Sequence, residues 1–305
     1  MLHIENLSHT YPGGVRALDR VSLDIPLGMF GLLGPNGAGK SSLMRCLATL
    51  QTPSDGHIRF GDIDVLADPQ RLRGMLGYLP QDFGVYPRVS AEDMLDHLAV
   101  LKGLTHRGER RDAVQGLLQQ VNLWDVRKRA LAGYSGGMRQ RFGIAQALLG
   151  QPRLVIVDEP TAGLDPEERN RFNNLLCEIG QSVVVILSTH IVDDVSDLCS
   201  RMAILVTGRI VAHGNPAALV EGVRGRVWAC TIERAQLPDY RRQFEVIATH
   251  LRAGRTQVQV LADAQPDPRF EPVPAALEHV YFATLQRQRS LAEAAAPQQA
   301  AATPE

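Results

Sequence analysis

A glycine-rich run near the start of the chain has the residue types that bind phosphate groups. Residues 34–41 read GPNGAGKS and fit the pattern G-x-x-x-x-G-K-[ST]. Glycines let the backbone curl so that its N–H groups point inward at phosphate oxygens. Lys40 would neutralise the β- and γ-phosphates of a nucleotide, and the Ser41 hydroxyl would hold Mg²⁺. The predicted nucleotide-binding residues are Gly34, Pro35, Asn36, Gly37, Ala38, Gly39, Lys40, Ser41 and Ser42.

Two adjacent carboxylates follow an apolar run further along the chain. Residues 154–157 (LVIV) predict a buried strand, and Asp158 and Glu159 follow it directly. In an open parallel sheet, ligands sit beyond the carboxyl ends of the strands, so Asp158 would lie near the phosphate loop and hold Mg²⁺. Glu159 would accept a proton from an attacking water. A pair of solvated acids opening a loop is the alternative, and the phosphate loop upstream disfavours it.

Strands and helices must bring these side chains together. The first 220 residues alternate short apolar runs with helical patterns, which predicts an α/β fold with a largely parallel sheet. Ser90 with Asp93, and Asp165 with Glu168, have the spacing of helix-capping pairs. Strands are predicted at 29–33, 154–157 and 183–187, a helix at 43–50, and a hairpin over 202–213.

The composition changes after residue 225. Strand-like runs at 227–232 and 257–261 and a helical pattern at 274–285 predict a small α+β accessory domain over 225–285, with a role in regulation or dimerisation. Residues 286–305 are rich in alanine, proline and glutamine, and we expect them to form a disordered tail.

Charge and composition exclude several classes of protein. The 305 residues include 32 basic and 33 acidic side chains, a formal net charge of −1, which disfavours a broad nucleic-acid-binding surface. No apolar run approaches the ~20 residues that span a bilayer, and the N-terminus lacks the pattern of a secretory signal. The four cysteines are far apart and are expected to be reduced thiols.

A glycine turn completes a set of motifs in a recognisable order. Residues 134–141 (YSGGMRQR) open a helical stretch upstream of the acidic strand. Taken by itself, this turn is an ordinary glycine-rich helix start. The full set resembles the ATP-binding cassette (ABC) family, the ATPase subunits of ABC transporters, over about residues 2–220. The matching pieces are Tyr11, the loop 34–42, Gln81, Ser135–Gly137, the strand and acids 154–159, Asp165 and His190.

The resemblance implies a fold and an assembly. The fold would be a P-loop NTPase cassette with a parallel-sheet core, an antiparallel β subdomain and a helical subdomain between Gln81 and Tyr134. Two such domains would pack head to tail around two ATP molecules. Ser135, Gly136 and Gly137 of one copy would bind the ATP held by the phosphate loop of the other copy. Asp165 would cross the dimer interface, although it is also a good helix N-cap.

The resemblance also implies individual roles. Tyr11 would stack on adenine, and its alternative role is that of a core tyrosine. Gln81 would touch Mg²⁺ or the attacking water and report to a transmembrane partner, or else be a surface glutamine. His190 would contact the γ-phosphate and position Glu159, although a lone histidine after a strand is more often structural. The catalytic set is then Glu159, His190, Lys40 and Gln81, and the metal set is Ser41, Gln81 and Asp158.

The turn departs from the family's usual L-S-G-G-Q at two positions, Tyr134 and Met138, and methionine cannot donate the hydrogen bonds of glutamine. This form resembles the exporter branch. We therefore expect an ATP- and Mg²⁺-dependent exporter subunit that forms a homodimer, joins a separate permease at the cytoplasmic face of the membrane, and does not bind nucleic acid. Residues 83–88 would face the permease or pack internally. The alternatives are a soluble ABC-type ATPase acting on nucleic acid or ribosomes, and a scaffold that binds nucleotide without hydrolysis.

Overall fold

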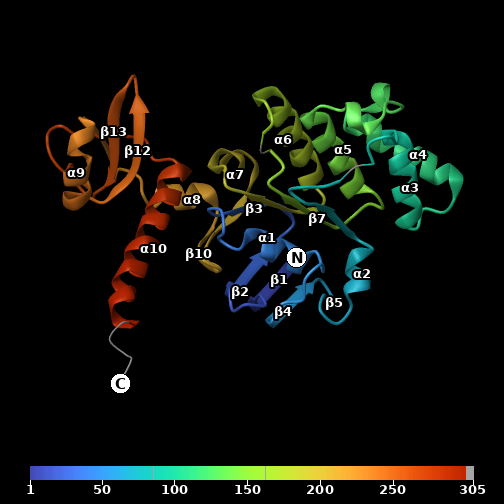
Figure 1. Cartoon of the computed structure of the whole chain (residues 1–305), viewed down its shortest axis with the longest axis horizontal. Helices are drawn as coiled ribbons and strands as arrows, with labels where there is room; N and C mark the ends of the chain where they lie inside the picture. Colours follow the sequence, from blue (N-terminus) through green and yellow to red (C-terminus); the bar gives the residue numbers. More distant parts are fainter. Residues whose placement is uncertain (85, 162, 300–305) are drawn as a thin grey trace. The chain divides into compact units, whose positions relative to one another are not determined.

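The computed structural model covers the chain and describes residues 1–84, 86–161 and 163–299, with side chains described as far as Leu291. The chain divides into two compact units, Met1–Ile210 and Val211–Glu305, and each is described by itself (Figure 1). Among the described residues, no helix has both the length and the apolar character that crossing a membrane requires.

A six-stranded sheet with the order β10-β9-β3-β8-β7-β6 forms the centre of the first unit. Neighbouring strands from β6 to β9 run parallel, as predicted. Every residue of β7 and β8 is buried, because helices cover parallel sheets on both faces. The strands are β3 (Gly28–Leu33), β6 (Leu76–Leu79), β7 (Leu154–Asp158), β8 (Val184–Thr189), β9 (Arg201–Val206) and β10 (Arg209–Gly214).

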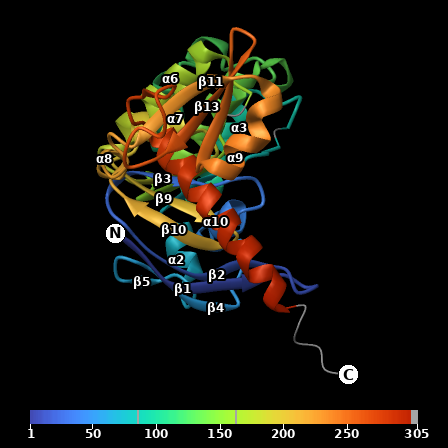
Figure 2. The same ribbon diagram turned by 90° about the vertical axis from the view of Figure 1, so that its left-hand side faces the viewer.

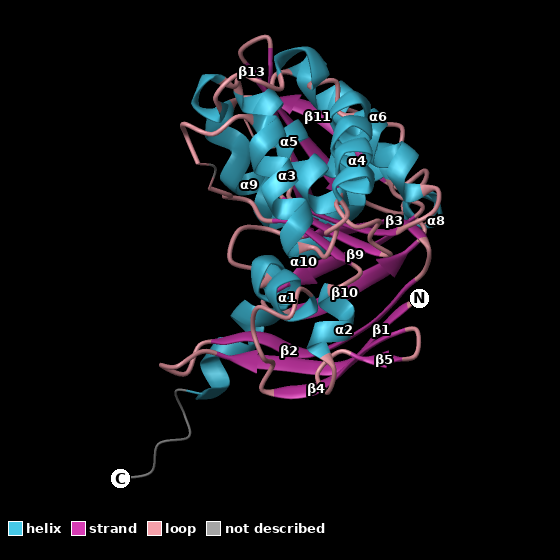
Figure 3. Cartoon of the chain, turned by 90° about the vertical axis from the view of Figure 1, so that its right-hand side faces the viewer, coloured by secondary structure: helices cyan, strands magenta, loops and turns pink. Residues whose placement is uncertain are grey.

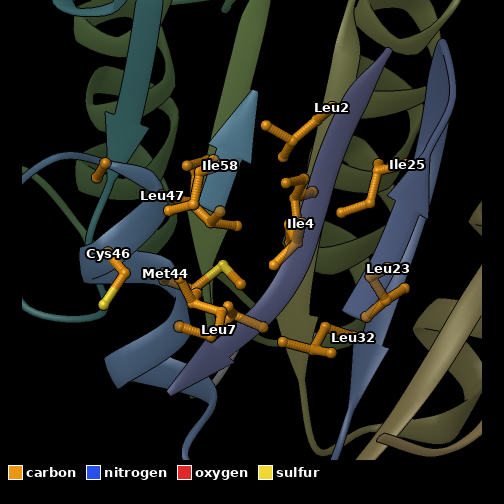
Figure 4. Packing of buried hydrophobic residues seen from close by; sticks show 14 of the residues in the cluster. Leu2, Ile4, Leu7, Leu23, Ile25, Leu32, Met44, Cys46, Leu47 and Ile58 are labelled. Atoms are coloured by element: carbon orange, nitrogen blue, oxygen red, sulfur yellow. The ribbon is translucent and has the colours of Figure 1, made fainter. Parts of the chain in front are cut away.

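A second, antiparallel sheet packs over the first helix and confirms the expected β subdomain. Its order is β2-β1-β4-β5, with β1 (Leu2–Thr10), β2 (Arg16–Ile25), β4 (Asp55–Phe60) and β5 (Ile63–Asp64). The helix is α1 (Lys40–Leu47), which begins at Lys40 rather than at the predicted residue 43. Figure 4 shows side chains from both sheets and α1 meeting in one core: Leu2, Ile4, Leu7, Leu23, Ile25, Leu32, Met44, Leu47 and Ile58.

The remaining helices of the first unit include the expected helical subdomain, which Figure 3 shows as a group around α3, α4 and α5. The Ser90 side chain caps α3 by accepting the Asp93 N–H, and Asp165 caps α6 by accepting the Glu168 N–H, as their spacing predicted. The helices are α2 (Pro69–Arg73), α3 (Ala91–Leu101), α4 (Arg107–Gln120), α5 (Gly136–Leu148), α6 (Pro166–Gly180) and α7 (Val192–Leu198), with 3-10 turns at Trp124–Val126 and Leu131–Gly133.

The second unit is a small α+β fold, as predicted. Its antiparallel sheet has the order β12-β13-β11-β14 and packs α9 against one apolar core and α10 against another (Figure 2). The elements are α8 (Pro216–Glu221), β11 (Val227–Ile232), a 3-10 turn (Arg234–Gln236), α9 (Leu237–Gln243), β12 (Val246–Arg252), β13 (Arg255–Leu261), β14 (Glu271–Pro272) and α10 (Leu277–Gln299).

The helix α10 corrects the predicted disorder of residues 286–305. It continues to Gln299, so the prediction is wrong for 286–299, and residues 300–305 lie outside the described residues. The composition that suggested disorder is also helix-forming, because alanine has the highest intrinsic helix propensity. The first turns of α10 are held by burial of Val280 and Ala283, and a helix that is already nucleated extends at little cost.

Candidate active site

The phosphate loop connects the carboxyl end of β3 to the first residue of α1. Gly39 has φ = 104°, and a Cβ atom there would lie 2.4 Å from the carbonyl oxygen of Ala17. Both the left-handed backbone and the close approach therefore require glycine. The Lys40 side chain is 6% exposed and folds into the loop, where its Nζ donates to the carbonyl oxygens of Gly34 at 2.7 Å and Pro35 at 3.3 Å. A positive charge is thereby held inside the predicted phosphate cradle.

Lys40, Glu159 and His190 meet at the ends of three adjacent strands. Glu159 Oε1 lies 3.3 Å from Lys40 Nζ, and Glu159 Oε2 lies 2.6 Å from His190 Nδ1. Glu159 is 7% exposed, whereas the side chain of His190 is 48% exposed. The carboxylate is thus buried between a cation and an imidazole that reaches solvent. Three residues that the sequence singled out separately form one cluster, because β3, β8 and β7 are neighbours in register.

The backbone at Glu159 is unusual. Its φ is +50°, a left-handed conformation for a residue with a side chain, and its N–H donates to the Ser188 carbonyl oxygen at 2.8 Å. Such a conformation costs on the order of 1–3 kcal/mol and persists only where the surrounding structure enforces it. The turn directs the chain away from the sheet immediately after the two acids.

Asp158 and Ser41 have the properties of magnesium ligands. Asp158 is 2% exposed, and its Oδ1 has no hydrogen-bond partner among the described residues, nor does the Oγ of Ser188, its register partner on β8. A buried carboxylate oxygen without a partner is costly, and a cation would satisfy it. Ser41 is exposed in the first turn of α1. A carboxylate and a hydroxyl suit Mg²⁺, which prefers oxygen ligands and commonly binds one or two carboxylates together with phosphate oxygens.

Tyr11 and Gln81 lie on segments adjacent to α1 and to β7. The Tyr11 hydroxyl lies 3.0 Å from Ser42 Oγ and 3.2 Å from Gln51 Oε1, so the tyrosine is tied to the helix that follows the phosphate loop. Its ring packs edge-on against His9. Gln81 is exposed, two residues beyond the end of β6, the strand that pairs with β7.

The side chains of Ser135 and Asp165 each accept a hydrogen bond that caps their own helix. Ser135 caps α5 by accepting the N–H of Met138 at 3.2 Å. Gly136 has open space around it, whereas a Cβ atom on Gly137 would lie 2.4 Å from Glu168 Oε2. Within the described part of the chain, no hydrogen bond or ion pair joins 135–137 or Asp165 to the phosphate loop. The structure therefore leaves their predicted roles in a second copy as predictions.

Asp194 is a buried acid that the sequence reasoning missed. It is fully buried on α7 and accepts hydrogen bonds from Thr161 Oγ1 at 2.7 Å, Arg169 Nε at 2.8 Å and Asn173 Nδ2 at 3.2 Å. Thr161 follows Glu159 by two residues, and α7 begins two residues after His190. The carboxylate thus links the segments that carry Glu159 and His190 to α6. Asp193-Asp194 has no sequence pattern that distinguishes it from a solvated acidic pair.

Comparison with known proteins agrees with this geometry. A family model described as "ABC transporter" matches residues 18–162. The daunorubicin/doxorubicin resistance ATP-binding protein DrrA of Streptomyces peucetius is 35% identical over 225 residues, which cover 73% of this chain and 68% of that protein. The phosphonates import ATP-binding protein PhnC of Chromohalobacter salexigens is 35% identical over 242 residues, which cover 75% of this chain and 89% of that protein.

Solved structures give the same result. A structure titled "Structure of ATP binding subunit of ABC transporter" superimposes with a TM-score of 0.66 at 29% identity, covering 74% of this chain and 95% of that one. Relatives at this level of identity, matched over more than two thirds of their own length, place the chain in the ABC transporter family as one of its ATP-binding, ATP-hydrolysing domains.

Proposed function

We propose that this chain is the Mg²⁺-dependent ATPase subunit of an ABC exporter, in which two copies close around two ATP molecules and drive a separate transmembrane subunit from the cytoplasmic face of the membrane. The observation that carries the proposal is the buried Glu159 carboxylate, held between Lys40 and His190 beside the phosphate loop. This arrangement puts a base, a cation and an imidazole where the terminal phosphate of a nucleotide would lie.

Each member of the cluster has a step in hydrolysis. Glu159 orients the attacking water and takes its proton. His190, hydrogen-bonded to Glu159 on one side and reaching solvent on the other, fixes the carboxylate and contacts the γ-phosphate. Lys40 exchanges its contacts with loop carbonyls and Glu159 for phosphate oxygens, which frees the carboxylate to act as a base. Phosphoryl transfer needs mostly such positioning and charge neutralisation.

Other residues would bind the metal ion and the adenine ring of the nucleotide. Mg²⁺, held by Ser41 and Asp158 with Gln81 beside it, would neutralise charge on the phosphates. Tyr11 stacks on adenine. Its hydroxyl contact with Ser42 supports this role, because the ring is then fixed against the phosphate-binding helix.

A second copy completes each site in this proposal. Gly136 is exposed with open space around it, and the Ser135 hydroxyl lies at the N-terminus of the 13-residue helix α5, where backbone N–H groups and the helix dipole favour an anion. The loss of the glutamine side chain at Met138 leaves these contacts intact. Asp165, exposed at the start of α6, would face the same interface.

The transmembrane subunit would dock in a groove on the first unit. The groove has a volume of about 380 Å³, and its lining includes Leu50, Tyr78 and Leu101. Leu50 is 63% exposed and Leu101 is 70% exposed. It borders β6, the strand that leads to Gln81, so a helix seated there is linked to the site through one short segment. In the adjacent segment Phe83 packs against Gly143 of α5, whereas Tyr86 is 65% exposed; Val85 lies outside the described residues.

Direction of transport and the role of the second unit complete the proposal. Relatives named for drug resistance support export, and so does the YSGGM turn. A relative named for import matches this chain at similar identity. The region 225–285 acts as an accessory domain for regulation or dimerisation, and the cassette spans 1–220. A membrane protein of several spans that co-purifies in detergent supports the transporter role, whereas co-purifying RNA or DNA favours the nucleic-acid alternative.

Substitution of Glu159, the proposed general base, tests the proposal. Glu159→Gln is expected to bind ATP normally, to lose at least about 99% of turnover, and to accumulate as an ATP-bound dimer in size-exclusion chromatography with light scattering. Glu167→Gln is the matched control, because Glu167 is an exposed acid of α6 whose partner is Arg171. Hydrolysis by Glu159→Gln at the wild-type rate would remove the assignment.

A further inference from the structure

The second unit contains a groove of about 500 Å³ along one edge of its sheet. One side is five consecutive residues of β12, 246–250, and the other side is a single face of α10. The helix residues are spaced at i, i+3, i+4 and i+7, which places them on one face. They are Phe282, Leu285, Gln286 and Arg289, and Arg241 of α9 closes the groove from the opposite face of the sheet.

The strand that lines the groove is an edge strand. Among the described strands β12 pairs only with β13, and from Ala248 to Arg252 the register is regular. The N–H and C=O groups on its other side therefore face the groove. Leu251, on the same strand, is 77% exposed. Native proteins usually block such an edge, because it is a template for pairing with another extended chain.

The charges around the groove have one sign. Arg241 and Arg289 line it, and among the residues that the structure describes no carboxylate does. Glu245, which precedes the groove residue Val246 in the chain, faces Arg287 at 3.6 Å. Neither Arg241 nor Arg289 has a hydrogen-bond or ion-pair partner in the part of the chain that is described. A second copy that paired its own β12 here would bring the same basic side chains together, which is unfavourable. Charge complementarity instead favours an acidic chain.

We propose that this groove binds an extended acidic segment of a partner protein, which adds a strand to the free edge of β12. The backbone of the segment would hydrogen-bond to β12 between Ala248 and Arg252. Its alternate side chains would point to the two faces of the sheet, so that apolar ones meet Phe282 and Leu285 on the α10 face while carboxylates reach Arg241 on the other face. Arg289 adds a second positive charge that attracts the acidic segment. The groove is then a recognition site, separate from the nucleotide-binding residues and independent of the direction of transport.

The first test is a binding titration with the full chain. A fluorescein-labelled peptide of alternating glutamate and valine, EVEVEV, is titrated by fluorescence anisotropy at low ionic strength, with KVKVKV as the opposite-charge probe. We expect EVEVEV to bind and KVKVKV not to bind. Arg241→Glu with Arg289→Glu should weaken EVEVEV binding by at least about tenfold. The matched control is Arg234→Glu with Arg255→Glu, which changes two exposed arginines of the second unit outside the groove lining and should bind within about twofold of wild type.

The second test reads the added strand directly. Bound EVEVEV should slow amide hydrogen exchange in residues 246–252 but not in β14, the strand at the opposite edge. The proposal is overturned if EVEVEV does not bind at concentrations up to about 1 mM, or if both peptides bind equally. It is also overturned if exchange in 246–252 slows with protein concentration in the absence of peptide, which identifies a second copy as the occupant. If deletion of 300–305 makes amide hydrogen exchange in residues 246–252 faster, the occupant of the groove is the chain's own C-terminal segment, and the proposal is likewise overturned.

Discussion

The Thr161 hydroxyl donates a hydrogen bond of 2.7 Å to the fully buried carboxylate of Asp194. The bond connects the segment that leaves Glu159 with the helix that follows His190. Arg169 and Asn173 of α6 donate to the other oxygen of the same carboxylate. The segments that carry Glu159 and His190 are therefore held in register by a carboxylate that hydrogen-bonds to neither residue.

Removal of this carboxylate should affect both stability and turnover. Asp194→Ala leaves one buried donor, Thr161, and two partly buried donors without this acceptor, so we expect the free energy of unfolding to fall by about 3 kcal/mol. Turnover should fall by about tenfold or more with little change in KM, because Glu159 loses its support from Thr161. Urea unfolding and steady-state ATPase assays measure the two effects.

Two further variants separate positioning from a general loss of structure. Asp194→Asn keeps one acceptor oxygen and should lose less turnover than Asp194→Ala. Asp193→Ala changes the exposed neighbouring acid and should alter stability by no more than about 0.5 kcal/mol. Equal effects of Asp193→Ala and Asp194→Ala would contradict the positioning role.

Mixing two inactive variants tests whether each site is shared between copies. Lys40→Ala removes the cation of the phosphate loop, and Ser135→Arg blocks the glycine turn; each homodimer should be inactive. In a 1:1 mixture, half of the dimers are mixed and each has one intact site, so about a quarter of wild-type turnover should return. Mixtures that remain inactive, or a Ser135→Arg variant with normal turnover, would show that the turn does not serve the partner's ATP.

The stability of the second unit should depend on pH through His279. Burial lowers the pKa of His279 below its ordinary value of 6.5, and its Nδ1 accepts the Ala276 N–H. The unfolded chain therefore takes up a proton that the folded chain resists. This stabilisation is complete above pH 6.5 and is lost as the pH falls toward the lowered pKa.

Tryptophan fluorescence can follow that unit separately. The chain has two tryptophans, so Trp124→Phe leaves Trp228 of β11 as the reporter. The urea midpoint should be lower at about pH 5.5 than at about pH 7.5, and His279→Gln should reduce this difference. His213→Gln, at an exposed histidine, should leave the difference unchanged. A wild-type pH dependence in His279→Gln would assign the effect to other groups.

Sequence patterns predicted the parts of the site that depend on local chemistry. The phosphate loop follows from glycine and lysine spacing, and the caps at Ser90 and Asp165 follow from side chains three residues from their targets. The meeting of Glu159 with His190 was implied by the resemblance to the ABC family. The parallel sheet accounts for it, because neighbouring parallel strands put their carboxyl ends on one edge.

The rest depended on contacts that the sequence does not display. Asp194 resembles any acid of an acidic pair until the fold buries it against α6. The groove in the second unit depends on the strand order β12-β13-β11-β14, which leaves β12 at an edge although it lies in the middle of that domain's sequence. The helical extension of α10 was missed because alanine-rich composition fits both disorder and helix.

The position of β3 in its sheet has a consequence for synthesis of the chain. Its neighbours are β8 and β9, which leave the ribosome roughly 150 residues after the phosphate loop does, so the pairing is strongly non-local. Until those strands arrive, Lys40 has no Glu159 or His190 opposite it, and both edges of β3 await their partners. We therefore expect nucleotide to bind the nascent protein late. A chain that stops short of β8 carries the loop sequence but neither the complete sheet nor His190.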